Sequence, residues 1–142
     1  MADDPRHAVI TGGGSGIGAA IARALASDGN RVSLIGRRPG PIADVARPIG
    51  GFAATADVTD RRSVDAAFEA ARDAHGPIEI LINCAGDAPS GKFANVSIEQ
   101  WRATLAVNLD ALFHCIQAAL PDLLAATAGR VVTIASTAGL KG

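Results

Sequence analysis

The glycine-rich stretch TGGGSGIG, residues 11–18, constrains the fold of this chain more than any other feature. It follows the apolar run Ala8–Ile10 and opens an apolar-periodic segment, Ile17–Ala26. A strand, a glycine turn and a helix in that order place free backbone N–H groups and the positive end of the helix dipole at one point. The stretch therefore predicts a phosphate-binding turn, with a glycine turn that has no ligand as the alternative.

The glycines of this turn have separate predicted roles. Gly12 allows a sharp turn, Gly16 lets the backbone approach a pyrophosphate, and Gly18 lets the helix pack closely on the strand. The predicted phosphate-binding residues of the turn are Gly12, Gly14, Ser15, Gly16, Ile17 and Gly18.

Five apolar runs predict strands that are buried on both faces of a parallel sheet. They are His7–Thr11, Arg31–Gly36, Gly51–Asp57, Ile78–Asn83 and Arg130–Ala135. Helical patterns lie between them. The first is Ile17–Ala26, with a stop at Gly29, and the second is a short segment, Pro41–Arg47. The third contains Val64, Phe68 and Ala71, starts at Thr59 or Asp60 and stops at Gly76-Pro77. The fourth is Trp101–Leu124. The last helix has a predicted capping box, Ser97 with Gln100, and a predicted kink or break at Pro121. This alternation predicts one α/β domain over residues 1–142, a Rossmann-type doubly wound sheet.

The composition excludes several classes of partner. A net charge of −1 offers no basic surface for nucleic acid and no polybasic membrane patch. No apolar run approaches the ~20 residues of a membrane-spanning helix, and the N-terminus MADDPRH lacks the apolar core of a signal peptide. Cys84 and Cys115 show neither disulfide nor metal spacing. We therefore expect a soluble cytoplasmic protein without a metal site.

Small or polar residues gather where the predicted strands end. In a doubly wound sheet the ligand lies outside the carboxyl ends of the strands. The segments at those ends are 11–18, 36–38, 57–58, 83–86 and 136–139, and they contrast with the apolar strands before them. The sequence therefore predicts a ligand site along this edge.

The second strand is followed by Gly36-Arg37-Arg38. An NAD site has an acidic residue about 20 residues past the glycines, where its carboxylate accepts hydrogen bonds from the ribose 2′-OH. A guanidinium group instead binds a 2′-phosphate through charge-assisted hydrogen bonds. Arg37 and Arg38 therefore favour NADP over NAD, the alternative being two arginines of a solvated loop.

Five motifs together make the chain similar to the short-chain dehydrogenase/reductase family. They are TGGGSGIG at 11–18, Asp57-Val58, NCAG at 83–86, VNL at 107–109 and IASTAG at 134–139. The resemblance covers nearly the whole chain and implies the strand order 3-2-1-4-5. The family fold continues with further strands that are not in this sequence.

The resemblance also implies roles for single residues. The position of Asp57, next to Val58, binds the adenine, and the segment Asn83, Ala85, Gly86 lies along the cofactor while Asn83 braces the central strand. The position of Asn108 supports a proton-relay water, and that of Ser136 hydrogen-bonds the substrate carbonyl or hydroxyl. Cys84 replaces the commoner Asn of the family.

The family's catalytic Tyr-x-x-x-Lys motif lies beyond the serine, whereas this chain ends at Gly142 and contains no tyrosine. The chain therefore resembles the N-terminal part of a longer enzyme, a homo-oligomer by family analogy. The implied reaction is hydride transfer between NADP(H) and a small-molecule carbonyl compound or secondary alcohol. Reductases of 3-oxoacyl thioesters, steroids, sugars and xenobiotics share these motifs. A non-catalytic dinucleotide-binding module and one half of a two-chain enzyme stay open as alternatives.

Overall fold

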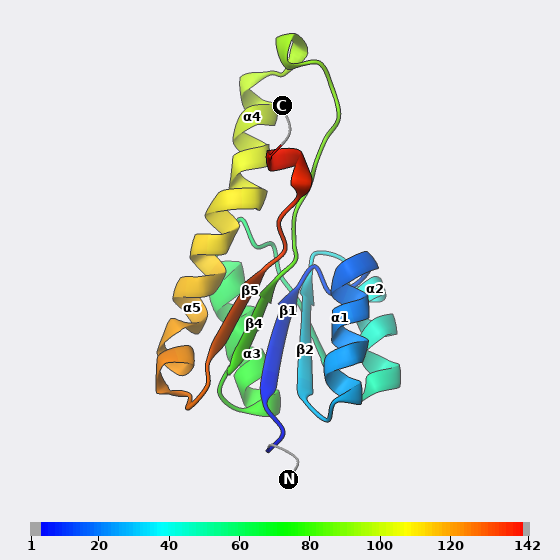
Figure 1. Ribbon diagram of the computed structural model, residues 1–142, viewed down its shortest axis with the longest axis vertical. Helices are drawn as coiled ribbons and strands as arrows, with labels where there is room; N and C mark the ends of the chain where they lie inside the picture. The colour runs from blue at the N-terminus through cyan, green and yellow to red at the C-terminus, as the bar shows by residue number, and fades with distance from the viewer. Residues whose placement is uncertain (1–3, 141–142) are drawn as a thin grey trace.

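The computed structural model describes residues 4–140 and contains a five-stranded parallel sheet in the order β3-β2-β1-β4-β5 (Figure 1). The strands are β1 (His7–Thr11), β2 (Arg31–Gly36), β3 (Phe52–Thr55), β4 (Ile80–Asn83) and β5 (Arg130–Thr133). The predicted α/β class and the strand order implied by the resemblance are both confirmed.

Three strands are shorter than the sequence predicted. The runs Gly51–Asp57, Ile78–Asn83 and Arg130–Ala135 contain the shorter strands β3, β4 and β5. Apolar composition set the predicted ends, whereas a strand ends where its pairing ends. The last pair of β2 and β3 joins Gly36 to Thr55, so Asp57 lies in the loop beyond the strand.

The helices follow the predicted patterns. They are α1 (Gly16–Ser27), α2 (Pro39–Ala46), α3 (Arg61–His75), α4 (Ile98–Leu105) and α5 (Ala111–Ala125). Asp60 caps α3 by accepting a hydrogen bond from the Arg62 backbone N–H, and the capping box of Ser97 and Gln100 starts α4. Short 3₁₀ turns lie at Arg47–Ile49, Phe93–Asn95 and Thr137–Gly139.

The sheet lies between two layers of helices. Helices α1 and α2 cover one face, while α3 and α5 cover the other (Figure 1). Along β1, Ala8 and Ile10 pack in the first layer and Val9 in the second, and all three are fully buried. This burial on both faces explains why the strands show near-continuous hydrophobicity.

Of the kink or break predicted at Pro121, the break is wrong. Helix α5 runs past Pro121 to Ala125, although a proline removes one intrahelical hydrogen bond. Ala119 and Leu123 are buried on either side of it, and this packing outweighs the lost hydrogen bond. The irregular part is a π-helical segment, Ala106–Asp110, which joins α4 to α5.

The stretch Ile98–Ala125 forms 28 helical residues, long and apolar enough to cross a membrane by length and composition alone. The sequence analysis predicted a helix over Trp101–Leu124 but did not count this stretch as long and apolar enough to cross a membrane. A core helix of a soluble protein passes the same test, and α5 buries Ala111, Cys115, Ala119 and Leu123 in the layer that it forms with α3. The expectation that the chain has no membrane partner stays a prediction.

A buried imidazole lies at the amino end of β1. His7 has no exposed surface, and its Nδ1 lies 2.8 Å from the Gly76 carbonyl oxygen. Because a carbonyl only accepts, Nδ1 donates, and in the neutral ring Nε2 accepts from the Ser33 hydroxyl at 2.8 Å. Burial lowers the pKa of His7 from 6.5, and His75 and Arg31 lower it further, although the Gly76 carbonyl opposes them.

We expect the free energy of unfolding to fall as the pH drops from 7 to 5. The unfolded chain binds a proton at His7 near pH 6.5, whereas the folded chain binds it only at lower pH, so acid favours unfolding. Urea denaturation at both pH values measures the loss. The variant His7→Gln should lose less stability over this interval, and an unchanged loss in the variant would contradict the assignment.

Candidate functional site

A groove of about 610 Å³ lies along the carboxyl ends of the strands. Most of the predicted cofactor-binding residues line it: Gly12, Gly14, Ser15, Gly16, Ile17, Arg37, Arg38, Asp57, Val58, Ala85 and Gly86. Gly18 and Asn83 are not among its lining residues. The groove therefore brings together residues from four of the five predicted segments, at the edge where they were expected.

The glycine turn has the geometry that its sequence predicts. Gly12 has a φ of +67°, and a Cβ atom there would lie 2.8 Å from the Ala85 backbone nitrogen. Gly16 has a φ of +51° and faces open space, so a ligand can approach its backbone. A Cβ atom at Gly18 would collide with the Gly12 carbonyl, which explains how Gly18 shapes the turn without lining the groove.

Asn83 and Thr11 support the groove from below. Asn83 is 3% exposed, and its Nδ2 lies 3.5 Å from the Thr133 hydroxyl oxygen of the neighbouring strand β5. The Thr11 hydroxyl oxygen accepts hydrogen bonds from the backbone N–H groups of Cys84 and Ala85, both at 3.2 Å. Thr11 therefore fixes the backbone after β4, a role that the sequence analysis did not assign to it.

Asp57 lies at the rim of the groove in an ordered loop. Its Oδ1 accepts hydrogen bonds from the Thr59 hydroxyl at 2.7 Å and from the Thr59 backbone N–H at 2.9 Å. These two bonds lower the pKa of Asp57, and the nearby Arg37 lowers it further. Asp57 is therefore an anionic acceptor at neutral pH.

A second hollow of about 450 Å³ contains both predicted catalytic residues, Asn108 and Ser136. It shares Cys84, Gly86, Asp87 and Ile134 with the groove. The two hollows therefore adjoin, and one site extends from the glycine turn to the end of β5.

The side chains of Asn108 and Ser136 differ in how many of their donor and acceptor groups already form hydrogen bonds. Asn108 Nδ2 donates to the carbonyls of Asp87 at 2.7 Å and Thr104 at 3.0 Å, and its Oδ1 accepts from the Asp87 backbone N–H at 3.2 Å. The Ser136 hydroxyl oxygen accepts from the Ala138 backbone N–H at 3.1 Å. The hydroxyl hydrogen of Ser136 can therefore donate to another acceptor, whereas the Asn108 amide is committed to the backbone.

Known proteins match both the sequence and the fold. The profile of the short chain dehydrogenase family matches residues 6–142. The chain belongs to the short-chain dehydrogenase family. Its members are oxidoreductases that use a nicotinamide cofactor on small-molecule substrates.

Individual relatives in the family are longer than this chain. An uncharacterised oxidoreductase of Staphylococcus epidermidis is 36% identical over 136 residues, which are 94% of this chain and 59% of the relative. The glycine betaine reductase ATRR of Emericella nidulans is 37% identical over 139 residues, which make up 94% of this chain and 11% of that protein. The chain thus spans less than two thirds of these relatives.

A solved structure of the family matches the fold closely. The crystal structure of an actinorhodin polyketide ketoreductase variant with NADPH superposes with a TM-score of 0.93 at 31% identity. The match covers 100% of this chain and 57% of the ketoreductase. The fold described above is therefore that of the corresponding part of the ketoreductase.

Some residues that line the groove were not predicted from the sequence. Ala103, Ala106 and Val107 line the groove from the α4 end of the long helix, and Pro41 and Ile42 line it from α2. These residues are apolar members of helical patterns, and only the tertiary fold brings their helices to the groove. The VNL motif, which begins at Val107, was the single signal for this part of the wall.

Proposed function

We propose that this chain provides the NADP(H) site and part of the active site of a carbonyl reductase or secondary-alcohol dehydrogenase. The observation that carries the proposal is the continuity of the groove at the glycine turn with the hollow that contains Ser136. A dinucleotide along this path would place its pyrophosphate at the start of α1, where the helix dipole favours an anion.

Two features support NADP(H) rather than NAD(H). Arg37 and Arg38 line the groove directly after β2, and both are exposed to a ligand. Guanidinium groups there would bind a 2′-phosphate through charge-assisted hydrogen bonds. The matching polyketide ketoreductase structure contains NADPH, which agrees with this assignment.

In the proposed reaction, the cofactor supplies or accepts the hydride, and the protein orients the substrate. Ser136 donates its free hydroxyl hydrogen to the carbonyl oxygen, where negative charge develops during reduction. Asn108 fixes the Asp87 backbone at the wall of the same hollow. The family's proton donor, a tyrosine, does not occur in residues 1–142.

A ketone-bearing substrate fits this proposal, and a 3-oxoacyl thioester is one candidate, in keeping with the polyketide ketoreductase that matches the fold. The alternatives to this proposal are a dinucleotide-binding module without catalysis and one half of a two-chain enzyme. We further propose a cytoplasmic homo-oligomer. Exposed apolar residues on the outer side of the long helix support an oligomer, among them Leu109, Phe113 and Leu124.

The test of the proposed function is NADPH oxidation by the full-length protein with a panel of ketones that includes a 3-oxoacyl thioester. A reductase oxidises NADPH only when a ketone is present, and the alcohol product is identified by mass spectrometry. Binding of NADPH without any ketone reduction would instead favour the non-catalytic module.

Residues 1–142 expressed alone are expected to give no turnover. Without a tyrosine the chain lacks the family's proton donor. Strand β5 also forms an edge of the sheet, with Val131 and Val132 each 44% exposed, so aggregation or pairing with another chain should accompany the isolated segment. An NADPH oxidation assay and light scattering on mass-verified protein measure both effects, and turnover by a monodisperse monomer would refute this prediction.

A further inference from the structure

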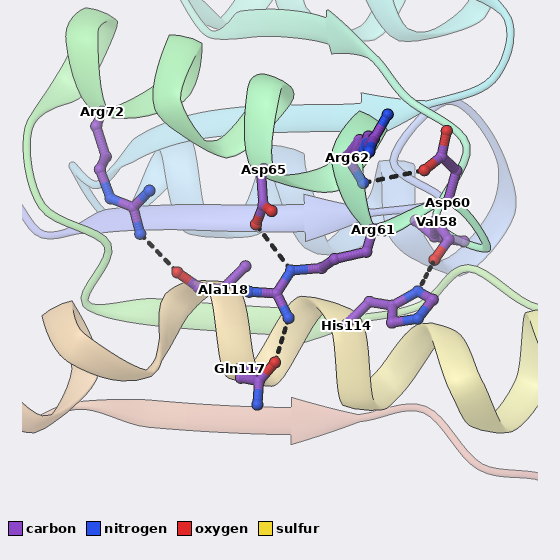
Figure 2. A network of polar contacts seen from close by, with 9 residues as sticks. All are labelled: Val58, Asp60, Arg61, Arg62, Asp65, Arg72, His114, Gln117 and Ala118. Atoms are coloured by element: carbon purple, nitrogen blue, oxygen red, sulfur yellow. Dashed lines mark hydrogen bonds and ion pairs between the residues drawn. The ribbon is translucent and has the colours of Figure 1, made fainter.

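Helices α3 and α5 are joined by polar contacts along their length (Figure 2). Far from the groove, Arg72 Nε lies 2.7 Å from Asp122 Oδ2. Nearer to it, Arg61 donates to the Gln117 side chain. These contacts join helix to helix and add to the apolar packing of α3 against α5.

The contact nearest the groove is different, because it joins α5 to the groove itself. His114 Nδ1 lies 3.0 Å from the Val58 carbonyl oxygen (Figure 2). A carbonyl oxygen only accepts, so Nδ1 carries the hydrogen and donates it. Val58 lines the groove between Asp57 and Thr59, and its side chain is 5% exposed in the core. His114 therefore contacts the outer side of a loop whose inner side faces the cofactor site.

The other hydrogen bonds of this loop are internal or lead to α3. Thr59 donates twice to Asp57, and the Asp57 backbone N–H donates to the Ser63 hydroxyl at 3.0 Å. Within residues 4–140, the bond from His114 is the one hydrogen bond between the loop and α5. The position of the loop relative to α5 thus depends on His114 and on the packing of the Val58 side chain.

Helix α5 is also the continuation of the segment that forms the opposite part of the site. The π-helical residues Ala106–Asp110 precede it directly, and they include Val107 of the groove and Asn108 of the adjoining hollow. A donor on the first turn of α5 therefore links the Asp57–Thr59 loop to the helix that bears Asn108.

We infer that His114 is a positioning residue that sets the Asp57–Thr59 loop for the adenosine end of the cofactor. This inference rests on the proposed function, since it assumes that a dinucleotide occupies the groove. His114 itself does not line the groove or the hollow. Its effect is therefore on affinity for the adenosine half, and chemistry at the nicotinamide half is unchanged once cofactor saturates the site.

The experiment compares variants of the full-length protein by isothermal titration with adenosine 2′,5′-bisphosphate and with reduced nicotinamide mononucleotide. His114→Leu removes the donor, and the dissociation constant for the bisphosphate should rise about tenfold, the upper range for one neutral hydrogen bond. Affinity for the mononucleotide and kcat at saturating NADPH should not change. His114→Asn keeps an N–H donor close to the Nδ1 position and should restore the affinity.

Gln117→Leu is the matched control, because it removes an α3–α5 contact one turn further from the groove. It should lower the melting temperature without changing affinity for the bisphosphate. Wild-type affinity in His114→Leu, or an equal loss in Gln117→Leu, would overturn the inference. If His114→Leu does not fold, His114→Phe gives the same comparison with a ring that cannot donate. Failure of the wild-type protein to bind the bisphosphate at all would instead refute the proposed function.

Discussion

Replacing Ser136 by alanine in the full-length protein is expected to lower the rate constant for hydride transfer by at least about a hundredfold. The Ser136 hydroxyl accepts one backbone hydrogen bond, so its own hydrogen is free to donate to the substrate oxygen of the proposed reaction. Charge on that oxygen grows in the transition state, so the lost donor affects the reaction rate more than ground-state binding. Single-turnover kinetics with pre-bound NADPH measure this rate constant directly.

Cofactor affinity should barely change in Ser136→Ala, because Ser136 lines the hollow next to the groove rather than the groove itself. Thr137→Ala is the control, since it removes the neighbouring hydroxyl from the same 3₁₀ turn. A melting curve of each variant separates the loss of the cap on Ala138 from the loss of catalysis. A wild-type single-turnover rate in Ser136→Ala would mean that the active site lies elsewhere.

Replacing both Arg37 and Arg38 by alanine should raise the dissociation constant for NADPH about ten- to hundredfold, or about 1.4 to 2.8 kcal/mol. Among residues 4–140, the two guanidinium groups are the cations that line the groove, and charge-assisted bonds to a phosphate are lost with them. NADH lacks the 2′-phosphate, so its affinity should be nearly unaffected. Fluorescence titration of both cofactors measures the difference.

A control with the same change in net charge is Arg47→Ala combined with Arg130→Ala. Arg47 follows α2 and pairs with Asp44, and Arg130 begins β5, at the end of the strand away from the groove. This double variant should keep the wild-type affinity for NADPH. Equal losses for NADPH and NADH in the Arg37 and Arg38 variant would show that the arginines do not recognise the 2′-phosphate.

The sequence predicted the fold well where local chemistry and tertiary packing agree. The bounds of β1 and β2 follow from apolar runs that are buried on both faces, and the capping box at Ser97 fixes the start of α4. Prediction failed where packing overrides local preference. Pro121 lies inside α5 because its neighbours Ala119 and Leu123 are buried, and proline chemistry alone does not contain that information.

The residues of the site were also predicted only in part. Glycines and polar residues after strands are visible in the sequence, and eleven of the thirteen predicted cofactor-binding residues line the groove, Gly18 and Asn83 being the other two. The positions of Val107 and His114 at the site depend on how a helix packs against a loop that is distant in the sequence. The contact of His114 could not be predicted from the sequence, because its partner is a backbone carbonyl and no residue pattern reveals which carbonyl will be near.

The most direct test of this account is the affinity of the unmodified full-length protein for NADPH and NADH, measured under one buffer and salt condition. Isothermal titration gives both dissociation constants and the stoichiometry. The account predicts one site per chain with tighter binding of NADPH, because the glycine turn receives the pyrophosphate and the arginines receive the 2′-phosphate. Equal or tighter binding of NADH, or no binding of either cofactor, would contradict it.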